Sequence, residues 1–119
     1  MEKILILDDN EDILALIQMI LDLEGYETKG ISAGSQLMQS VDEFNPDLIL
    51  LDVLLGDSDG RILCNTLKAN PATASIPIIM ISASHAVFSL QDDYLKPDDF
   101  IAKPFDIDDL VNRVKKALI

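Results

Sequence analysis

The sequence contains a single cysteine, Cys64, and therefore cannot form an internal disulfide. One thiol suits a reducing compartment, and we expect a cytoplasmic protein. No apolar run approaches the length of a membrane span, and the first residues lack the basic-then-apolar pattern of a signal peptide. We therefore expect no membrane partner.

Basic residues are scarce as well. Lys and Arg number 9 against 21 Asp and Glu, which gives a formal net charge of −12. A nucleic-acid backbone would repel such a chain, so we expect no direct nucleic-acid contact. The charge suits a protein that binds a cation or meets basic partners. Most of the acids are expected only to keep the surface soluble.

The apolar residues that are present form two alternating patterns. With 49% hydrophobic residues in 119, the chain is the size of one globular domain. Short apolar segments predict strands at 3–7, 26–32, 46–52, 76–82 and 100–102, the half-polar second one at a sheet edge. Helical stripes lie around 13–20, 37–44, 60–69, 87–94 and 107–118. These five βα units predict an α/β fold, a doubly wound five-stranded parallel sheet with helices on both faces.

Several single residues have ordinary explanations. Met19, Met38 and Met80 are expected in core or half-buried positions. Cys64 lies on a helical pattern and is expected to be a small apolar residue. His85, the only histidine, is expected to face solvent at the start of a helix.

Polar residues end or directly follow four of the five predicted strands. They are Asp8 and Asp9, Asp52, Ser82 and Lys103. The carboxyl ends of parallel strands border the crevice where open α/β sheets bind ligands, so these residues are expected to converge. Asp52 is the most unusual of them, because it interrupts the apolar run "LILLDVLL" and its charge is costly to bury alone.

This set suits phosphoryl transfer. Three neighbouring carboxylates repel one another unless a cation or proton intervenes, and Mg²⁺ is well matched to carboxylate oxygens, water and phosphate. With the cation bound, one oxygen of Asp52 is free to attack phosphorus. Lys103 and Ser82 can hold the other phosphoryl oxygens by charge and by a hydrogen bond. Positioning and charge neutralisation are the main needs of this chemistry.

Four motifs then carry a family resemblance: "LILDDNED", "DLILLDVLLGDSDG", "IPIIMISA" and "FIAKPF". In this order and spacing they resemble the receiver domain of bacterial two-component response regulators, across residues 1–119 as one domain. The resemblance implies a flavodoxin-like strand order 2-1-3-4-5. It also implies a phosphorylation-activated signalling switch without turnover of an external substrate.

The resemblance further implies a role for each site residue. Asp52 would be the phosphoacceptor and Lys103 would contact the phosphoryl group, with a cis peptide between Lys103 and Pro104. Ser82 and Phe100 would form the conformational switch. The Mg²⁺ ligands would be Asp9, Asp52 and the main-chain carbonyl of Leu54 directly, with Asp8 acting through water.

The implied partners are a sensor histidine kinase or a histidine phosphotransfer protein, and a downstream protein of unknown identity. We expect a monomer or a weak phosphorylation-dependent dimer. Two arrangements stay open: a regulator that acts alone by protein contact, and a receiver that is part of a longer protein.

The sequence departs from the family pattern at two places. Gly56 stands where proline is usual after the acceptor strand, which predicts a more flexible loop. Residues 85–99 are acidic and lack the usual small-residue turn, so the signalling surface is the least typical part. Leu54 and Ser84 occupy positions that tune the phosphoryl lifetime and offer little to orient an attacking water, which predicts a long-lived phosphoform.

Four alternatives fit the sequence less well. Lys96 also precedes a proline but lies too close to Ser82 for a helix and a strand to intervene. A haloacid-dehalogenase-type phosphatase needs an acid two residues after its nucleophile, where this chain has Leu54. A pseudo-receiver, which keeps the fold without phosphotransfer, predicts a missing member of the polar set, and all five are present. A flavodoxin-like electron carrier conflicts with the loop "DDNED", which would repel a flavin phosphate.

Overall fold

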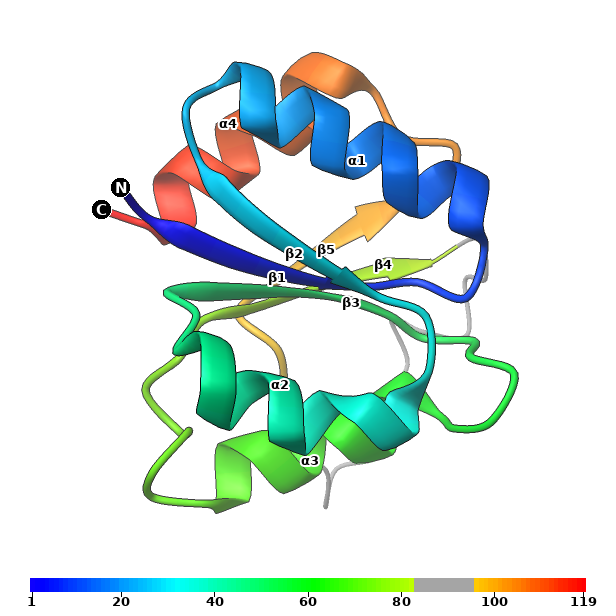
Figure 1. The fold of residues 1–119 in the computed structure, drawn as a ribbon, viewed down its shortest axis with the longest axis vertical. Coiled ribbons are helices and arrows are strands. Elements are labelled where there is room, and N and C mark those ends of the chain that lie inside the picture. The colour runs from blue at the N-terminus through cyan, green and yellow to red at the C-terminus, as the bar shows by residue number, and fades with distance from the viewer. Residues whose placement is uncertain (83–95) are drawn as a thin grey trace.

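A computed structural model gives the arrangement of residues 1–82 and 96–119. Five parallel strands form one sheet in the order β2-β1-β3-β4-β5, which confirms the expected fold class (Figure 1). β2 lies at an edge, as its half-polar sequence predicted. The strands are β1 (Lys3–Leu7), β2 (Glu27–Ile31), β3 (Leu48–Asp52), β4 (Ile78–Ser82) and β5 (Asp99–Ala102).

Within residues 1–82 and 96–119, four α-helices cover the sheet, two on each face. Figure 1 shows α1 and α4 together on one face and α2 and α3 on the other. A short 3₁₀ turn, η1 (Gly34–Gln36), leads into α2. The helices are α1 (Glu11–Leu23), α2 (Leu37–Phe44), α3 (Gly60–Ala69) and α4 (Ile107–Ala117). The helix predicted around 87–94, together with Ser84 and His85, lies outside the described residues.

The three central strands β1, β3 and β4 are buried on both faces, because successive side chains point to opposite sides of the sheet and helices cover both sides. One core lies under α2 and α3, and its strand residues include Leu5, Ile49 and Met80. The other lies under α1 and α4 and includes Ile6 and Leu50. Both cores continue to the carboxyl ends of the strands. The first polar residue after each strand is therefore held by a rigid apolar framework.

The expectation for the methionines is right for one of three. Met80 is fully buried in β4, but Met19 in α1 and Met38 in α2 are exposed, with 55% and 39% of their surface accessible. Cys64 is buried against the sheet, as expected. Among residues 1–82 and 96–119, no helix is both long and apolar enough to cross a bilayer.

Candidate phosphoryl-transfer site at the carboxyl edge of the sheet

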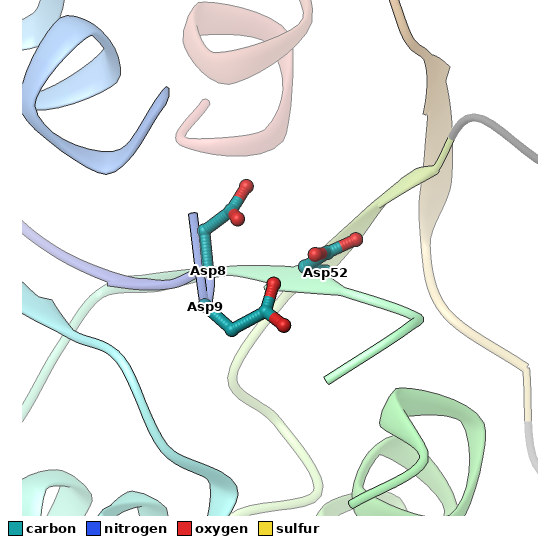
Figure 2. Close-up of side chains that lie close together, drawn as sticks. All are labelled: Asp8, Asp9 and Asp52. Atoms are coloured by element: carbon teal, nitrogen blue, oxygen red, sulfur yellow. The ribbon is translucent and has the colours of Figure 1, made fainter. Parts of the chain in front are cut away.

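The polar residues predicted from the strand ends lie on four adjacent strands or directly after them. Asp8 and Asp9 follow β1, Asp52 ends β3, Ser82 ends β4 and Lys103 follows β5. Figure 2 shows the three carboxylates extending from the ends of β1 and β3 into the same space. Because β1, β3, β4 and β5 are consecutive in the sheet, the strand order itself brings these side chains together.

Backbone hydrogen bonds continue past the ends of the strands and fix these positions. The N–H of Asp8 donates to the carbonyl of Ile31 at 3.2 Å, and the N–H of Lys103 donates to the carbonyl of Ser82 at 2.8 Å. The N–H of Val53, directly after the β3 carboxylate, donates to Ile81 at 3.3 Å. The site therefore rests on sheet hydrogen bonds rather than on free loops.

The three carboxylates are close together but differ in burial. Each of Asp8, Asp9 and Asp52 offers an oxygen within 4.8 Å of the others. Asp8 is 1% exposed and Asp52 is 5% exposed, whereas Asp9 is exposed to solvent. A cation in this cluster would thus have two walls of fixed, buried oxygen atoms and one side open to water.

Lys103 supplies the positive charge of the site. Its Nζ atom lies 2.9 Å from Oδ2 of Asp8 and 3.4 Å from Oδ2 of Asp52. Its side chain is largely buried, so both contacts form where solvent screening is weak. Lys96, the rival considered from the sequence, is exposed outside this cluster. Lys103 is therefore the lysine that the fold brings to the carboxylates.

Asp8 is held from two directions. Its Oδ2 atom accepts from Lys103, and its Oδ1 atom accepts from the backbone N–H of Asn10 at 2.9 Å. Asn10 in turn is the N-cap of α1, accepting from the N–H groups of Asp12 and Ile13. Asn10 was not among the site residues predicted from the sequence, although an Asn before an amphipathic stripe is a recognisable N-cap signal.

The electrostatics of the site act most strongly on Asp52. Burial disfavours its carboxylate and the charge of Asp8 repels it, so the pKa of Asp52 rises to about 6 although Lys103 opposes the shift. With all groups ionised, three carboxylates face one ammonium group. The excess negative charge equals the charge of one divalent cation.

The donor set fits Mg²⁺. Hard divalent cations bind carboxylate oxygens, and clustered oxygens within 4.8 Å can reach a single ion. Among residues 1–82 and 96–119, the cluster offers carboxylate oxygens, the donor type that hard cations prefer. The carbonyl of Leu54, proposed from the resemblance as a further ligand, belongs to the β3–α3 loop and stays a prediction. The side chain of Leu54 is 61% exposed.

The backbone of Asp52 is also approached closely from α3. A Cβ atom on Gly60 would lie 2.8 Å from the Cα atom of Val53 and would collide with the carbonyl oxygen of Asp52. The N–H of Gly60 donates to the carbonyl of Val53 at 2.8 Å. A glycine is therefore required where α3 begins, and the helix packs directly behind the carboxylate.

Ser82 and Phe100 lie on adjacent strands, with Met80 paired to Phe100 and Ser82 paired to Ala102. Ser82 is 3% exposed, and Phe100 is partly buried against the core under α2 and α3. The peptide bond between Lys103 and Pro104 is cis, as the resemblance implied.

Comparison with known proteins gives consistent matches. The chain matches the family model described as the response regulator receiver domain over residues 4–115. It is 34% identical over 120 residues to the transcriptional regulatory protein GltR of Pseudomonas aeruginosa, covering 98% of this chain and 48% of GltR. The DNA-binding response regulator MtrA of Mycobacterium tuberculosis is 34% identical over 121 residues, with 98% and 50% covered. The chain spans about half the length of these curated relatives.

Solved structures with this fold include a putative response regulator from Chloroflexus aurantiacus, with a TM-score of 0.88 and 32% identity, covering 98% of this chain and 97% of that one. A second is the signal receiver domain of a signal transduction histidine kinase from Syntrophus aciditrophicus, with a TM-score of 0.90 and 33% identity. That match covers 99% of this chain and 90% of the other.

Receiver domains are in general signalling modules rather than enzymes that turn over a substrate, and phosphorylation and Mg²⁺ are general features of them. The sheet order, the acidic cluster and the match over residues 4–115 agree. The chain belongs to the response regulator receiver domain family.

Proposed function

We propose that this chain, as one receiver domain, is a signalling switch that accepts a phosphoryl group on Asp52 from a phosphohistidine. The observation that carries the proposal is the meeting of a buried Asp52 with Lys103 and two further carboxylates at one sheet edge. A structural ion pair needs one acid and one base. Three carboxylates around one lysine instead suit a site that takes up a cation and a phosphoryl group.

Asp52 is the nucleophile in this proposal. One of its oxygens forms a bond to phosphorus while the bond between phosphorus and the histidine nitrogen of the donor breaks, and the departing imidazole takes up a proton. Lys103 is close enough to Asp52 to meet the negative charge of the phosphoryl oxygens. Its second partner, Asp8, keeps the ammonium group in place before the phosphoryl group arrives.

Asp9, Asp52 and the carbonyl of Leu54 would hold Mg²⁺ directly, and Asp8 would act through water. When bound, the cation neutralises carboxylate charge and draws in phosphoryl oxygens. The exposed position of Asp9 suits this role, because a cation that retains water ligands needs one open side. The pKa of Asp52, about 6, means that its ionised form is already dominant at neutral pH.

Ser82 and Phe100 would convert the added group into a change of surface. The buried hydroxyl of Ser82 ends the strand next to that of Asp52 and would hydrogen-bond a phosphoryl oxygen. Movement of this hydroxyl vacates space beside Phe100, which is only partly buried and would turn inward. The two residues thus form a two-state element that phosphorylation biases.

The partners in this proposal are a sensor histidine kinase or a histidine phosphotransfer protein, and a downstream protein that recognises the phosphorylated form. A monomer or a weak phosphorylation-dependent dimer, a cytoplasmic location and the absence of direct nucleic-acid contact by this chain stay predictions.

Phosphoramidate tests the proposal, because its phosphorus–nitrogen bond resembles that of phosphohistidine. We expect Mg²⁺-dependent phosphorylation of the parent, detected by a phosphate-affinity gel shift, and none of Asp52→Asn. A Ser82→Ala variant should still accept the group but lose the shift of the Phe100 amide resonance that follows phosphorylation of the parent. A chain that binds Mg²⁺ and stays unphosphorylated would instead be a pseudo-receiver.

A further inference from the structure

If the proposed function holds, the β3–α3 loop must keep the carbonyl of Leu54 at a fixed position in the cation site. Gly56 gives this loop freedom that a proline at the same position would remove. A Cβ atom on Gly56 would lie 3.8 Å from the Oδ2 atom of Asp9, so the glycine is beside the carboxylate cluster. Some other feature must therefore limit the motion of this loop.

Asp57 supplies such a restraint from the far side of the loop. Its Oδ1 atom accepts from the N–H of Gly34 at 2.9 Å, and its Oδ2 atom accepts from the N–H of Ser35 at 3.2 Å. These hydrogen bonds lower the pKa of Asp57, which shows that the arrangement favours the charged form. The carboxylate thus joins the β3–α3 loop to the turn η1 that precedes α2.

The two segments are also packed tightly at this point. A Cβ atom on Gly34 would lie 2.7 Å from the Cβ atom of Ser58 and 3.1 Å from the Cδ1 atom of Leu63. Only a residue without a side chain allows Asp57 to reach both backbone N–H groups. The same loop closes on itself, since the N–H of Leu55 donates to the carbonyl of Ser58 at 3.2 Å.

Short backbone links carry this restraint toward the cation site. Leu54 forms an isolated antiparallel bridge with Asp59, two residues beyond Asp57. Asp59 is in turn the N-cap of α3 and forms two hydrogen bonds with the guanidinium group of Arg61. Residues 54 to 59 are therefore a compact loop with the cation site on one side and Gly34 on the other.

We propose that Asp57 is a positioning residue, which holds the carbonyl of Leu54 in place by binding the backbone N–H groups of Gly34 and Ser35. This inference rests on the proposed function, because the carbonyl matters only if the site binds a cation. A purely structural role for Asp57 would change the free energy of unfolding and leave the Mg²⁺ affinity of the folded protein unaltered.

The test is Mg²⁺ titration of metal-stripped protein by calorimetry, with folding of each variant checked by circular dichroism. Asp57→Ala should bind Mg²⁺ roughly tenfold more weakly than the parent, the size expected when support of a metal ligand is lost. Asp57→Asn keeps one acceptor oxygen and should fall between the two. Asp42→Ala, which removes an exposed acid from α2, controls for the lost charge and should stay within about twofold of the parent.

Gly34→Ala provides a second test that changes no charge. Its methyl group would push Ser58 and the loop away from η1, so the Mg²⁺ affinity should fall as it does in Asp57→Ala. Combining the two substitutions should add little to either, since both break the same contact. Parent-like affinity in folded Asp57→Ala and Gly34→Ala would refute the positioning role. Failure of the parent to bind Mg²⁺ would instead refute the cation site of the proposed function.

Discussion

Replacing Asp52 with Asn should make the metal-free protein more stable at neutral pH. The carboxylate of Asp52 is buried beside Asp8, and among the described residues Lys103 is the cation that compensates its charge. An amide of nearly the same shape removes the repulsion and the cost of burying the charge. Lys103 keeps its shorter contact with Asp8, so the substitution leaves no cation unpaired.

The magnitude follows from the pKa of Asp52. Folding raises it from 3.8 to about 6, and two pKa units correspond to about 3 kcal/mol between the protonation states. We expect Asp52→Asn to gain about 1 to 3 kcal/mol in the free energy of unfolding at neutral pH. The lower figure allows for solvent and side-chain rearrangement around the ionised group.

The effect has a defined pH dependence. Because the pKa in the folded state is above that in the unfolded state, the native protein binds more protons between these two values. The contribution of Asp52 to the stability of the parent is therefore fully present below about pH 4 and is lost as the pH rises through about 6. Asp52→Asn lacks this loss, so the difference between the two proteins should vanish in acid and reach its maximum above about pH 7.

Urea unfolding of both proteins in EDTA, at several pH values, measures this difference. Mg²⁺ should then stabilise the parent more than Asp52→Asn, because a ligand that binds only the native state raises its stability. An exposed-acid variant such as Asp42→Asn provides the control for a general charge effect. If Asp52→Asn is no more stable than the parent at neutral pH, or if its advantage persists in acid, the electrostatic account of the site is wrong.

Three further predictions concern other residues. Lys103→Met should lower the free energy of unfolding by about 3 kcal/mol at neutral pH, because the buried carboxylate of Asp8 loses the ammonium group that neutralises it. An unchanged midpoint of urea unfolding would contradict this. Burial raises the pKa of the Cys64 thiol to about 11, so this thiol should react with a thiol reagent only as the protein unfolds. Rapid modification of the native protein would refute its burial. The phosphoform should persist well beyond seconds, since Leu54 and Ser84 offer little to orient water; loss of phosphate within seconds from purified protein would overturn that expectation.

The fold was predictable because its signals are local. Uninterrupted apolar segments that alternate with amphipathic helices directly predict a parallel sheet. The helix α3 has the predicted bounds Gly60–Ala69. The site followed from the fold, since residues after parallel strands meet at one edge. The different burial of Asp8 and Asp9 was not foreseen, because the residues that precede them on both faces of β1 are equally buried.

Features that depend on loop conformation or on packing width could not be predicted. The sequence does not distinguish Asp57 from other acids in turns, because its hydrogen bond with the N–H of Gly34 depends on the backbone conformation of both loops. Leu16 and Met19 are exposed although the helical period includes Leu16, because both line an open groove between α1 and α4. The raised pKa of Asp52 depends on distances to Asp8 and Lys103 that the sequence does not contain.

The most direct test of the central claim is the intact mass of the parent and of Asp52→Asn after incubation with Mg²⁺ and acetyl phosphate. One added phosphoryl group on the parent, none on Asp52→Asn and none on the parent in EDTA is the result that the site geometry predicts. Phosphorylation of both proteins would place the acceptor elsewhere in the chain. No addition to a parent that demonstrably binds Mg²⁺ would mean that the cluster around Asp52 keeps its arrangement but lacks the chemistry.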